Sequence, residues 1–221
     1  MIDKNEVLRY LGHKGQDIDE DLNSLIDSSI KEVLDKVKPK QVFETYNIRR
    51  ENKVIYIEGT KLKLVGDDIY KCLDNCDKVV LMAVTLGTDI ERLIRLNQKV
   101  NMTKTVILDS IATAYVEAIC DKIEEDIFNK YKEENKGLSF RYSPGYGDLG
   151  LEIQGDFLDT LNARRVIGLT VSSSNLLIPR KSVTAILGIK NNQSKKIKRT
   201  CANCLNYESC KFRKDGVKCG D

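Results

Sequence analysis

An almost uninterrupted apolar run from Lys78 to Leu86, KVVLMAVTL, constrains the fold of this chain most. A run of this length without polar alternation is typical of a strand that is buried on both faces. Such a strand has to lie inside a sheet, because both of its faces need apolar cover. Gly87 ends the run, and Thr88-Asp89 begins a helix that we expect to extend through Leu96.

Strands and helices alternate along the rest of the chain. Residues 41–65 contain short apolar segments separated by Asn52 and Gly59-Thr60, which predicts an antiparallel meander. Apolar residues three and four apart predict helices over Asp17–Val37 and Thr103–Tyr131. Further elements are expected over 3–11, 67–73 and 155–167 as helices, and over 169–171 and 182–189 as strands. The sequence therefore predicts an α+β fold, with a central, mostly antiparallel twisted sheet and packed helices.

Composition places most of the chain in one globular domain. The 221 residues are 41% hydrophobic and 31% charged, and the net charge is only +3. That charge is uneven, because residues 190–221 hold nine Lys and Arg against three Asp and Glu. We expect a domain over 1–190, a basic linker over 191–200 and a cysteine-rich tail over 201–221. No apolar run reaches the ~20 residues that span a bilayer, and Met1–Val7 lacks a signal-peptide core, so a cytoplasmic location is expected.

The seven cysteines fall into two kinds. Cys72 and Cys76 are four apart, which on a helix would place both on one face, and we expect them to be small buried hydrophobes. Four others, in a C-x2-C-x5-C-x8-C pattern, predict either structural zinc or an iron–sulfur cluster. They are Cys201, Cys204, Cys210 and Cys219. The alternative is a tail whose cysteines pair on oxidation.

The segment Arg141-Tyr-Ser-Pro-Gly-Tyr-Gly-Asp148, hereafter the signature loop, concentrates residues that suit ligand binding. Glycine lets backbone approach a ligand closely, and proline stiffens a turn. Arginine offers a planar fork of donors for a carboxylate or phosphate, and tyrosine offers a flat face with a polar tip. The loop therefore suits a small, flat ligand with an anionic end. An ordinary tight turn with a solvated arginine is the alternative.

Three motifs in order resemble one known family. Arg141-x-x-x-Gly145-Tyr146 resembles the loop that binds S-adenosylmethionine (AdoMet) in the reactivation domain of cobalamin-dependent methionine synthase. Asp109–Ala118 is similar to the family helix of small residues and glutamates. Leu169-Thr-Val-Ser and Ile178-Pro-Arg-Lys-Ser-Val-Thr184 are similar to its closing segment. The three matches lie in order across roughly residues 105–185, and the resemblance implies the family's activation-like α+β fold for the domain over residues 1–190.

The resemblance also implies roles for individual residues. Arg141 would pair with the AdoMet carboxylate, the Gly145-Tyr146 backbone would lie along the ligand, and Glu117 would meet its amino group. The chain departs from the family pattern at Thr113, where the family has the earlier of two glutamates. It also departs at Gly147–Gly150, where the family has Pro-Ala-Cys-Pro, and it has no counterpart of the family's final Tyr-Tyr strand.

The function that follows from the resemblance is reductive reactivation of a methionine synthase. The family domain repairs a cobalamin that has slipped from cob(I) to cob(II), with an external reductant and a methyl group from AdoMet. The cobalamin would be carried by a partner protein, because His13, the one histidine, lacks the Asp-x-His-x-x-Gly context of a cobalt ligand. The alternative function is an iron–sulfur electron-transfer factor, or a zinc-stabilised docking or assembly factor for a corrinoid protein, without AdoMet binding. A third alternative is a zinc-tailed module that binds nucleic acid or protein, with nucleic acid the less favoured partner. No membrane is expected in any of these cases.

Overall fold

A computed structural model describes residues 2–13 and 15–191. These residues form two compact units. The first unit comprises the described residues up to Val42, together with Ala83–Glu124 and Asn162–Val183. The second comprises Phe43–Met82, Glu125–Leu161 and the described residues from Thr184 onward. Three strands (β1, β4 and β8) and one helix (α5) contribute residues to both units.

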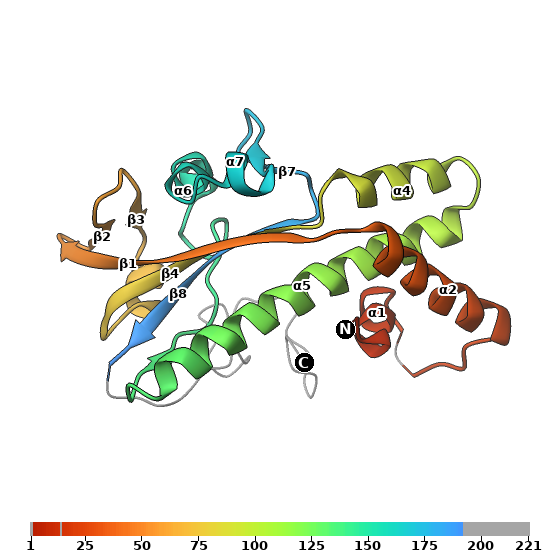
Figure 1. Cartoon of the computed structure of the whole chain (residues 1–221), viewed down its shortest axis with the longest axis horizontal. Helices are drawn as coiled ribbons and strands as arrows, with labels where there is room; N and C mark the ends of the chain where they lie inside the picture. The colour runs from red at the N-terminus through yellow and green to blue at the C-terminus, as the bar shows by residue number, and fades with distance from the viewer. Residues whose placement is uncertain (1, 14, 192–221) are drawn as a thin grey trace. The chain divides into compact units, whose positions relative to one another are not determined.

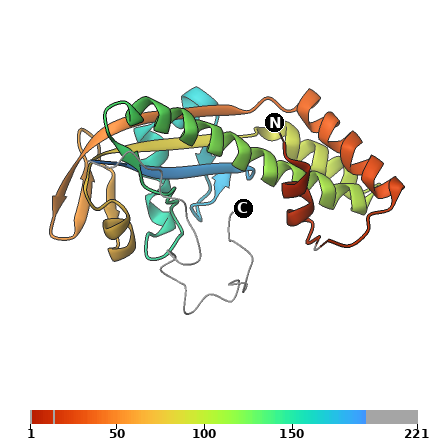
Figure 2. The same ribbon diagram turned by 90° about the horizontal axis from the view of Figure 1, so that it is seen from below.

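A six-stranded sheet has the order β3-β2-β1-β4-β8-β5 (Figures 1 and 2). Its strands are β1 Lys40–Glu51, β2 Val54–Ile57, β3 Lys63–Val65, β4 Cys76–Thr85, β5 Gly137–Leu138 and β8 Ser182–Lys190. The predicted buried strand is β4, in which every residue from Val79 to Thr85 is buried. It lies between β1 and β8, which confirms that the apolar run belongs inside the sheet.

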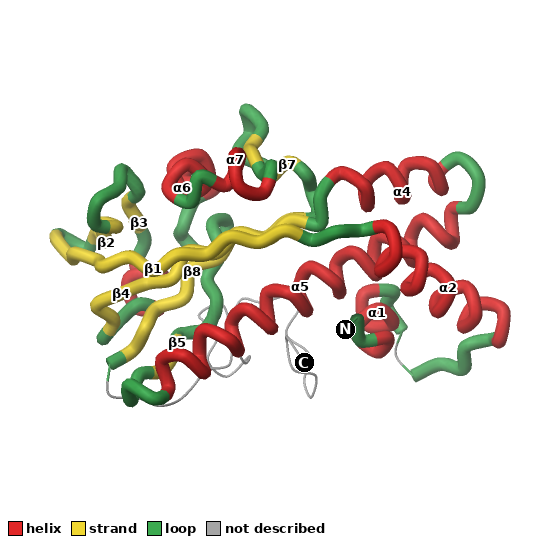
Figure 3. Tube along the Cα trace, viewed as in Figure 1, coloured by secondary structure: helices red, strands yellow, loops and turns green. Residues whose placement is uncertain are grey.

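The predicted meander is the β1–β2–β3 part of this sheet, drawn as yellow strands in Figure 3. Both of its pairings are antiparallel, with Glu51 opposite Val54 and Val54 opposite Val65. The β1–β2 turn consists of Asn52 and Lys53 alone, and both have positive φ, at 50° and 63°. Two left-handed residues match the twist of a two-residue hairpin, and they fix the register of β1 against β2.

Helices dominate the first unit. It contains α1 Lys4–Tyr10, α2 Glu20–Lys36, α4 Thr88–Gln98, most of α5 Met102–Lys132 and α7 Ala163–Ile167. Helix α2 begins where Asp19 accepts the N–H of Leu22 at 2.7 Å, and it buries Ile26 and Val33. Figures 1 and 2 both show α2 beside the start of α5. The short β6 Thr170–Val171 and β7 Leu177–Ile178 form a separate antiparallel pair.

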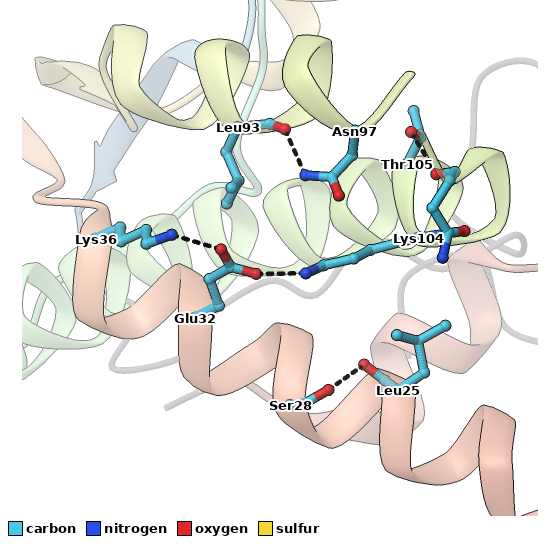
Figure 4. A network of polar contacts seen from close by, with 9 residues as sticks. Leu25, Ser28, Glu32, Lys36, Leu93, Asn97, Lys104 and Thr105 are labelled. Atoms are coloured by element: carbon cyan, nitrogen blue, oxygen red, sulfur yellow. Dashed lines mark hydrogen bonds and ion pairs between the residues drawn. The ribbon is translucent and has the colours of Figure 1, made fainter. Parts of the chain in front are cut away.

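An ion-pair network joins α2 to α5 (Figure 4). The carboxylate of Glu32 accepts from Lys36 at 2.6 Å, one turn along α2, and from Lys104 of α5 at 2.8 Å. The Glu32 side chain is only 22% exposed, so water screens these pairs incompletely. Lys104, and after it Lys36, holds the pKa of Glu32 below its ordinary value. The network therefore ties the two helices together while the carboxylate is ionised.

Two sequence predictions are corrected by the structure. The helix expected over 155–167 is two helices, α6 Gln154–Thr160 and α7 Ala163–Ile167, because Asn162 between them has a left-handed backbone with φ 50°. Cys72 and Cys76 do not share a helix, since Cys72 ends α3 Asp67–Cys72 and Cys76 begins β4. Both thiols are buried as expected, and burial raises the pKa of Cys76 to about 11.

Candidate functional site

The signature loop follows β5 and is attached along strand β8 in the second unit. After β5 pairs with the end of β8, the backbone N–H of Ser139 donates to the carbonyl of Gly188 at 2.9 Å, and the Ser139 hydroxyl accepts the N–H of Gly188 at 2.8 Å. Tyr142 then exchanges two backbone hydrogen bonds with Ile186, at 2.9 and 2.8 Å. Arg141 is therefore held at the base of the loop, between two points of attachment to the sheet.

Hydrogen bonds close the loop on itself. The N–H of Gly145 donates to the carbonyl of Leu149 at 2.7 Å, and the N–H of Leu149 donates to the carbonyl of Tyr146 at 3.1 Å. That carbonyl also accepts the hydroxyl of Tyr142 at 3.0 Å. These groups are committed within the loop, so a ligand lying along Gly145-Tyr146 would meet the face of the backbone rather than these hydrogen-bonding groups.

Gly147 is required at its position by both conformation and space. Its φ is 54°, in the left-handed region that favours glycine. A Cβ added there would lie 2.5 Å from Oδ2 of Asp68 and closer still to the Tyr142 hydroxyl. Gly145 also has positive φ, at 91°, and a Cβ there would lie 2.9 Å from Cδ2 of Leu151. The two glycines thus let this loop fold tightly.

The Asp148 carboxylate fastens the loop to helix α3, a contact that sequence reasoning missed. It accepts the N–H of Asp67 at 2.6 Å and the N–H of Asp68 at 3.2 Å, which are the first two residues of α3. A carboxylate at this end of a helix satisfies N–H groups that lack a partner inside the helix. Gly66 allows this approach, because a Cβ there would lie 2.9 Å from Cγ of Asp148. Asp148 therefore holds the loop on the turn between β3 and α3.

Three of the four predicted ligand-binding residues lie together on this loop. Arg141 is half-buried, and its Nη1 nitrogen is shielded from solvent. Gly145 is exposed, and the Tyr146 side chain is 48% exposed. Hydrogen bonds within the loop hold its backbone rigid. This backbone carries the Arg141 guanidinium at its base and the exposed ring of Tyr146. This arrangement suits a small ligand that has a carboxylate and a flat ring.

Glu117, the fourth predicted residue, is half-buried on α5 within the first unit. Burial, and next the charge of Glu117, raise the pKa of Tyr10 on α1. One turn earlier, the hydroxyl of Thr113 accepts a hydrogen bond from Nζ of Lys181 at 3.0 Å. The same Nζ forms an ion pair with Oδ1 of Asp109 at 2.9 Å. A cation thus lies beside the position where the family has its earlier glutamate.

An open groove of about 470 Å³ lies in the first unit. It is lined by Glu91, Ile94, Arg95, Gln98, Asp109, Arg180 and Lys181. Glu91 accepts the backbone N–H of Arg180, and Asp109 pairs with Lys181, so both carboxylates are engaged. The guanidinium groups of Arg95 and Arg180 form no ion pair with another described residue.

The predicted metal ligands Cys201, Cys204, Cys210 and Cys219 lie outside the described residues, and their metal stays a prediction. Within residues 2–13 and 15–191, no group of three or more His, Cys, Asp or Glu side chains is arranged to hold a metal ion. In the same residues, no helix has both the length and the hydropathy to cross a membrane.

Comparison with known proteins supports the fold. No family model matches the sequence, and no curated protein matches it. Among solved structures, the crystal structure of the MetH reactivation domain bound to AdoHcy matches with a TM-score of 0.62 and 15% identity. The match covers 85% of this chain and 73% of that chain. The chain therefore has the α+β fold of the MetH reactivation domain, with a mostly antiparallel sheet and packed helices, as its three motifs predict.

Proposed function

We propose that this protein binds AdoMet and acts in the reductive reactivation of a cobalamin-dependent methyltransferase, specifically a methionine synthase. One observation carries the proposal: Arg141, Gly145 and Tyr146 lie on a rigid loop within the fold of a domain solved with AdoHcy. AdoHcy is what remains of AdoMet after its methyl group has left. The protein would be a component of the methionine synthase system, with the cobalamin carried by the partner.

The chemistry of the loop residues supports AdoMet as the ligand. The Arg141 guanidinium would pair with the carboxylate of the ligand, and the tight backbone at Gly145-Tyr146 would lie along it. Glu117 lies on α5 in the first unit, and its role toward the ligand's amino group stays a prediction from the resemblance. Bound AdoMet would supply an electrophilic methyl group for a reduced cobalamin. The part of this chain is to bind and orient the donor, while a separate reductant protein supplies the electron.

Calorimetry with anaerobically purified protein tests this proposal. We expect saturable AdoMet binding, and we expect Arg141→Ala to weaken it roughly tenfold to a hundredfold, because a hydrogen-bonded charge pair is lost. Arg165→Ala is the matched control, since Arg165 is an exposed arginine on α7. Absence of AdoMet binding by folded wild-type protein would show that only the fold is shared.

The spacing of Cys201, Cys204, Cys210 and Cys219 favours a second candidate function. In that case the tail would hold an iron–sulfur cluster for electron transfer, or zinc that stabilises a docking or assembly module for a corrinoid protein. Visible absorption and metal analysis of the anaerobic protein separate these two cases. A cytoplasmic location is part of either proposal, because thiols stay reduced there.

A further inference from the structure

The turn between α4 and α5 exposes an unusual concentration of apolar side chains. Four large apolar residues within eleven positions are more than half exposed, namely Leu96 at 61%, Val100 at 86%, Met102 at 62% and Val106 at 51%. Leu96 and Val106 each lie about one helical turn from the connection, Val100 lies at its centre, and Met102 is the first residue of α5. Several exposed apolar side chains gathered at one turn mark an interaction site more often than a single exposed residue does.

The exposure is a property of an ordered turn. Val100 and Asn101 both donate their N–H groups to the carbonyl of Asn97, at 3.0 and 2.8 Å. The side chain of Asn101 then accepts the N–H of Lys104 at 2.9 Å and caps the start of α5. The side chain of Asn97 donates to the carbonyl of Leu93 at 2.9 Å (Figure 4). These bonds hold the apolar side chains in the exposed arrangement, so the surface is formed before any partner binds.

Positively charged residues accompany these apolar side chains along the same segment. Between Arg92 and Val106 the chain carries four cations and no carboxylate. Lys104 is committed to Glu32, whereas Arg92, Arg95 and Lys99 are exposed and form no ion pair with another described residue. Arg95 also lines the groove of the first unit, where Arg180 adds a second guanidinium. An apolar centre with a basic edge complements a surface that has an apolar centre and an acidic edge.

We propose that the α4–α5 turn is a docking surface for an acidic protein partner. A second copy of this chain is disfavoured as the occupant, because a two-fold interface would bring two copies of the same basic segment, with Arg92, Arg95 and Lys99, together. A membrane is disfavoured because residues 92–106 contain no aromatic side chain, and interfacial anchors are rich in them. The inference rests on the proposed function, which identifies the partner as the cobalamin-binding module of a methionine synthase.

Binding of that module tests the surface. The probe is a purified cobalamin-binding module from a methionine synthase without its own reactivation domain, titrated into the full-length chain. We expect Val100→Glu and Arg95→Glu each to weaken binding by roughly tenfold, and added salt to weaken binding to the wild-type chain. Val166→Glu is the matched control, because Val166 is a 53% exposed valine on α7 of the same unit, and it should bind like wild type.

The outcomes of these experiments distinguish failure of the docking surface from failure of the proposed function. Equal binding by Val100→Glu and Val166→Glu, or no binding of the module to a wild-type chain that binds AdoMet, would overturn the docking surface and leave AdoMet binding standing. Failure of AdoMet binding alone would remove the proposed function, while the module titration still decides the surface. Cosedimentation with phosphatidylserine vesicles that is lost in Val100→Glu would assign the turn to a membrane and overturn the protein partner.

Discussion

The signature loop and the α4–α5 turn use their side chains in opposite ways. In the loop, the Tyr142 hydroxyl and the Asp148 carboxylate form hydrogen bonds with neighbouring backbone, and the Tyr146 ring is half exposed. In the turn, polar groups hold the backbone while large apolar side chains point to solvent. The first arrangement suits a small molecule that needs fixed geometry. The second suits a protein, because only a broad partner can cover that much apolar surface.

Gly147→Ala should have the largest effect, and it tests whether the signature loop needs its fixed geometry. The added methyl group meets Asp68 and Tyr142, and alanine is strained at φ 54°, so we expect a local cost of about 1–3 kcal/mol and loss of AdoMet binding. Thermal unfolding and AdoMet calorimetry measure the two effects. Gly155→Ala is the matched control, since a Cβ there meets nothing within 4 Å, and it should retain both properties. Wild-type affinity in Gly147→Ala would show that the tight loop is not needed.

Asp148→Ala should have the next largest effect. It removes the acceptor for the first N–H groups of α3, which is comparable to losing a helix cap, at a cost of about 0.5–2 kcal/mol. We expect AdoMet affinity to fall with it, because the loop would lose its attachment to the β3–α3 turn. Asp148→Asn keeps a carbonyl acceptor and should recover most of the affinity. Equal losses in the two variants would contradict a role through these hydrogen bonds.

The sequence predicted the elements whose signal is local. Strand β4 follows from a run of buried apolar residues, and α5 follows from apolar residues three and four apart over most of its length. The signature loop followed from its own composition and order. Local patterns carry this information because β4 is buried along its whole apolar run and α5 buries an apolar stripe.

Contacts between distant segments could not be predicted in the same way. The bond from Asp67 to Asp148 joins residues 81 positions apart, and no periodic pattern encodes it. The glycine at Gly66, directly before two aspartates, was the available signal, because it marks a close backbone approach. The exposure of Leu96 and Val100 was also missed, since periodicity counts an apolar residue without telling whether anything covers it. The break at Asn162 was missed because asparagine reaches a left-handed backbone without glycine.

Removal of the Glu32 carboxylate tests the ion pair that joins the start of α5, next to the α4–α5 turn, to α2. Glu32→Gln loses its ion pairs with Lys36 and Lys104, and we expect a cost of roughly 0.5–1 kcal/mol at neutral pH. Because the folded pKa of Glu32 is lowered, this stabilisation is present above the carboxyl's ordinary pKa and is lost as pH falls through the folded value. Wild type and Glu32→Gln should therefore converge in stability in acid. A difference that persists at low pH would assign the effect to packing instead of charge.

Val100→Ser should have the smallest effect on stability, within about 0.5 kcal/mol, because an 86% exposed side chain loses little packing. The same change should weaken binding of the cobalamin-binding module, since the serine removes apolar surface that the partner would cover. Thermal unfolding and module titration on one preparation measure both quantities. We expect stability to be kept and module binding to be weakened in Val100→Ser, whereas stability and AdoMet binding should both fall in Gly147→Ala. A large loss of stability in Val100→Ser would mean that the turn is part of the core of its unit, and its apolar side chains would then need no partner to explain them.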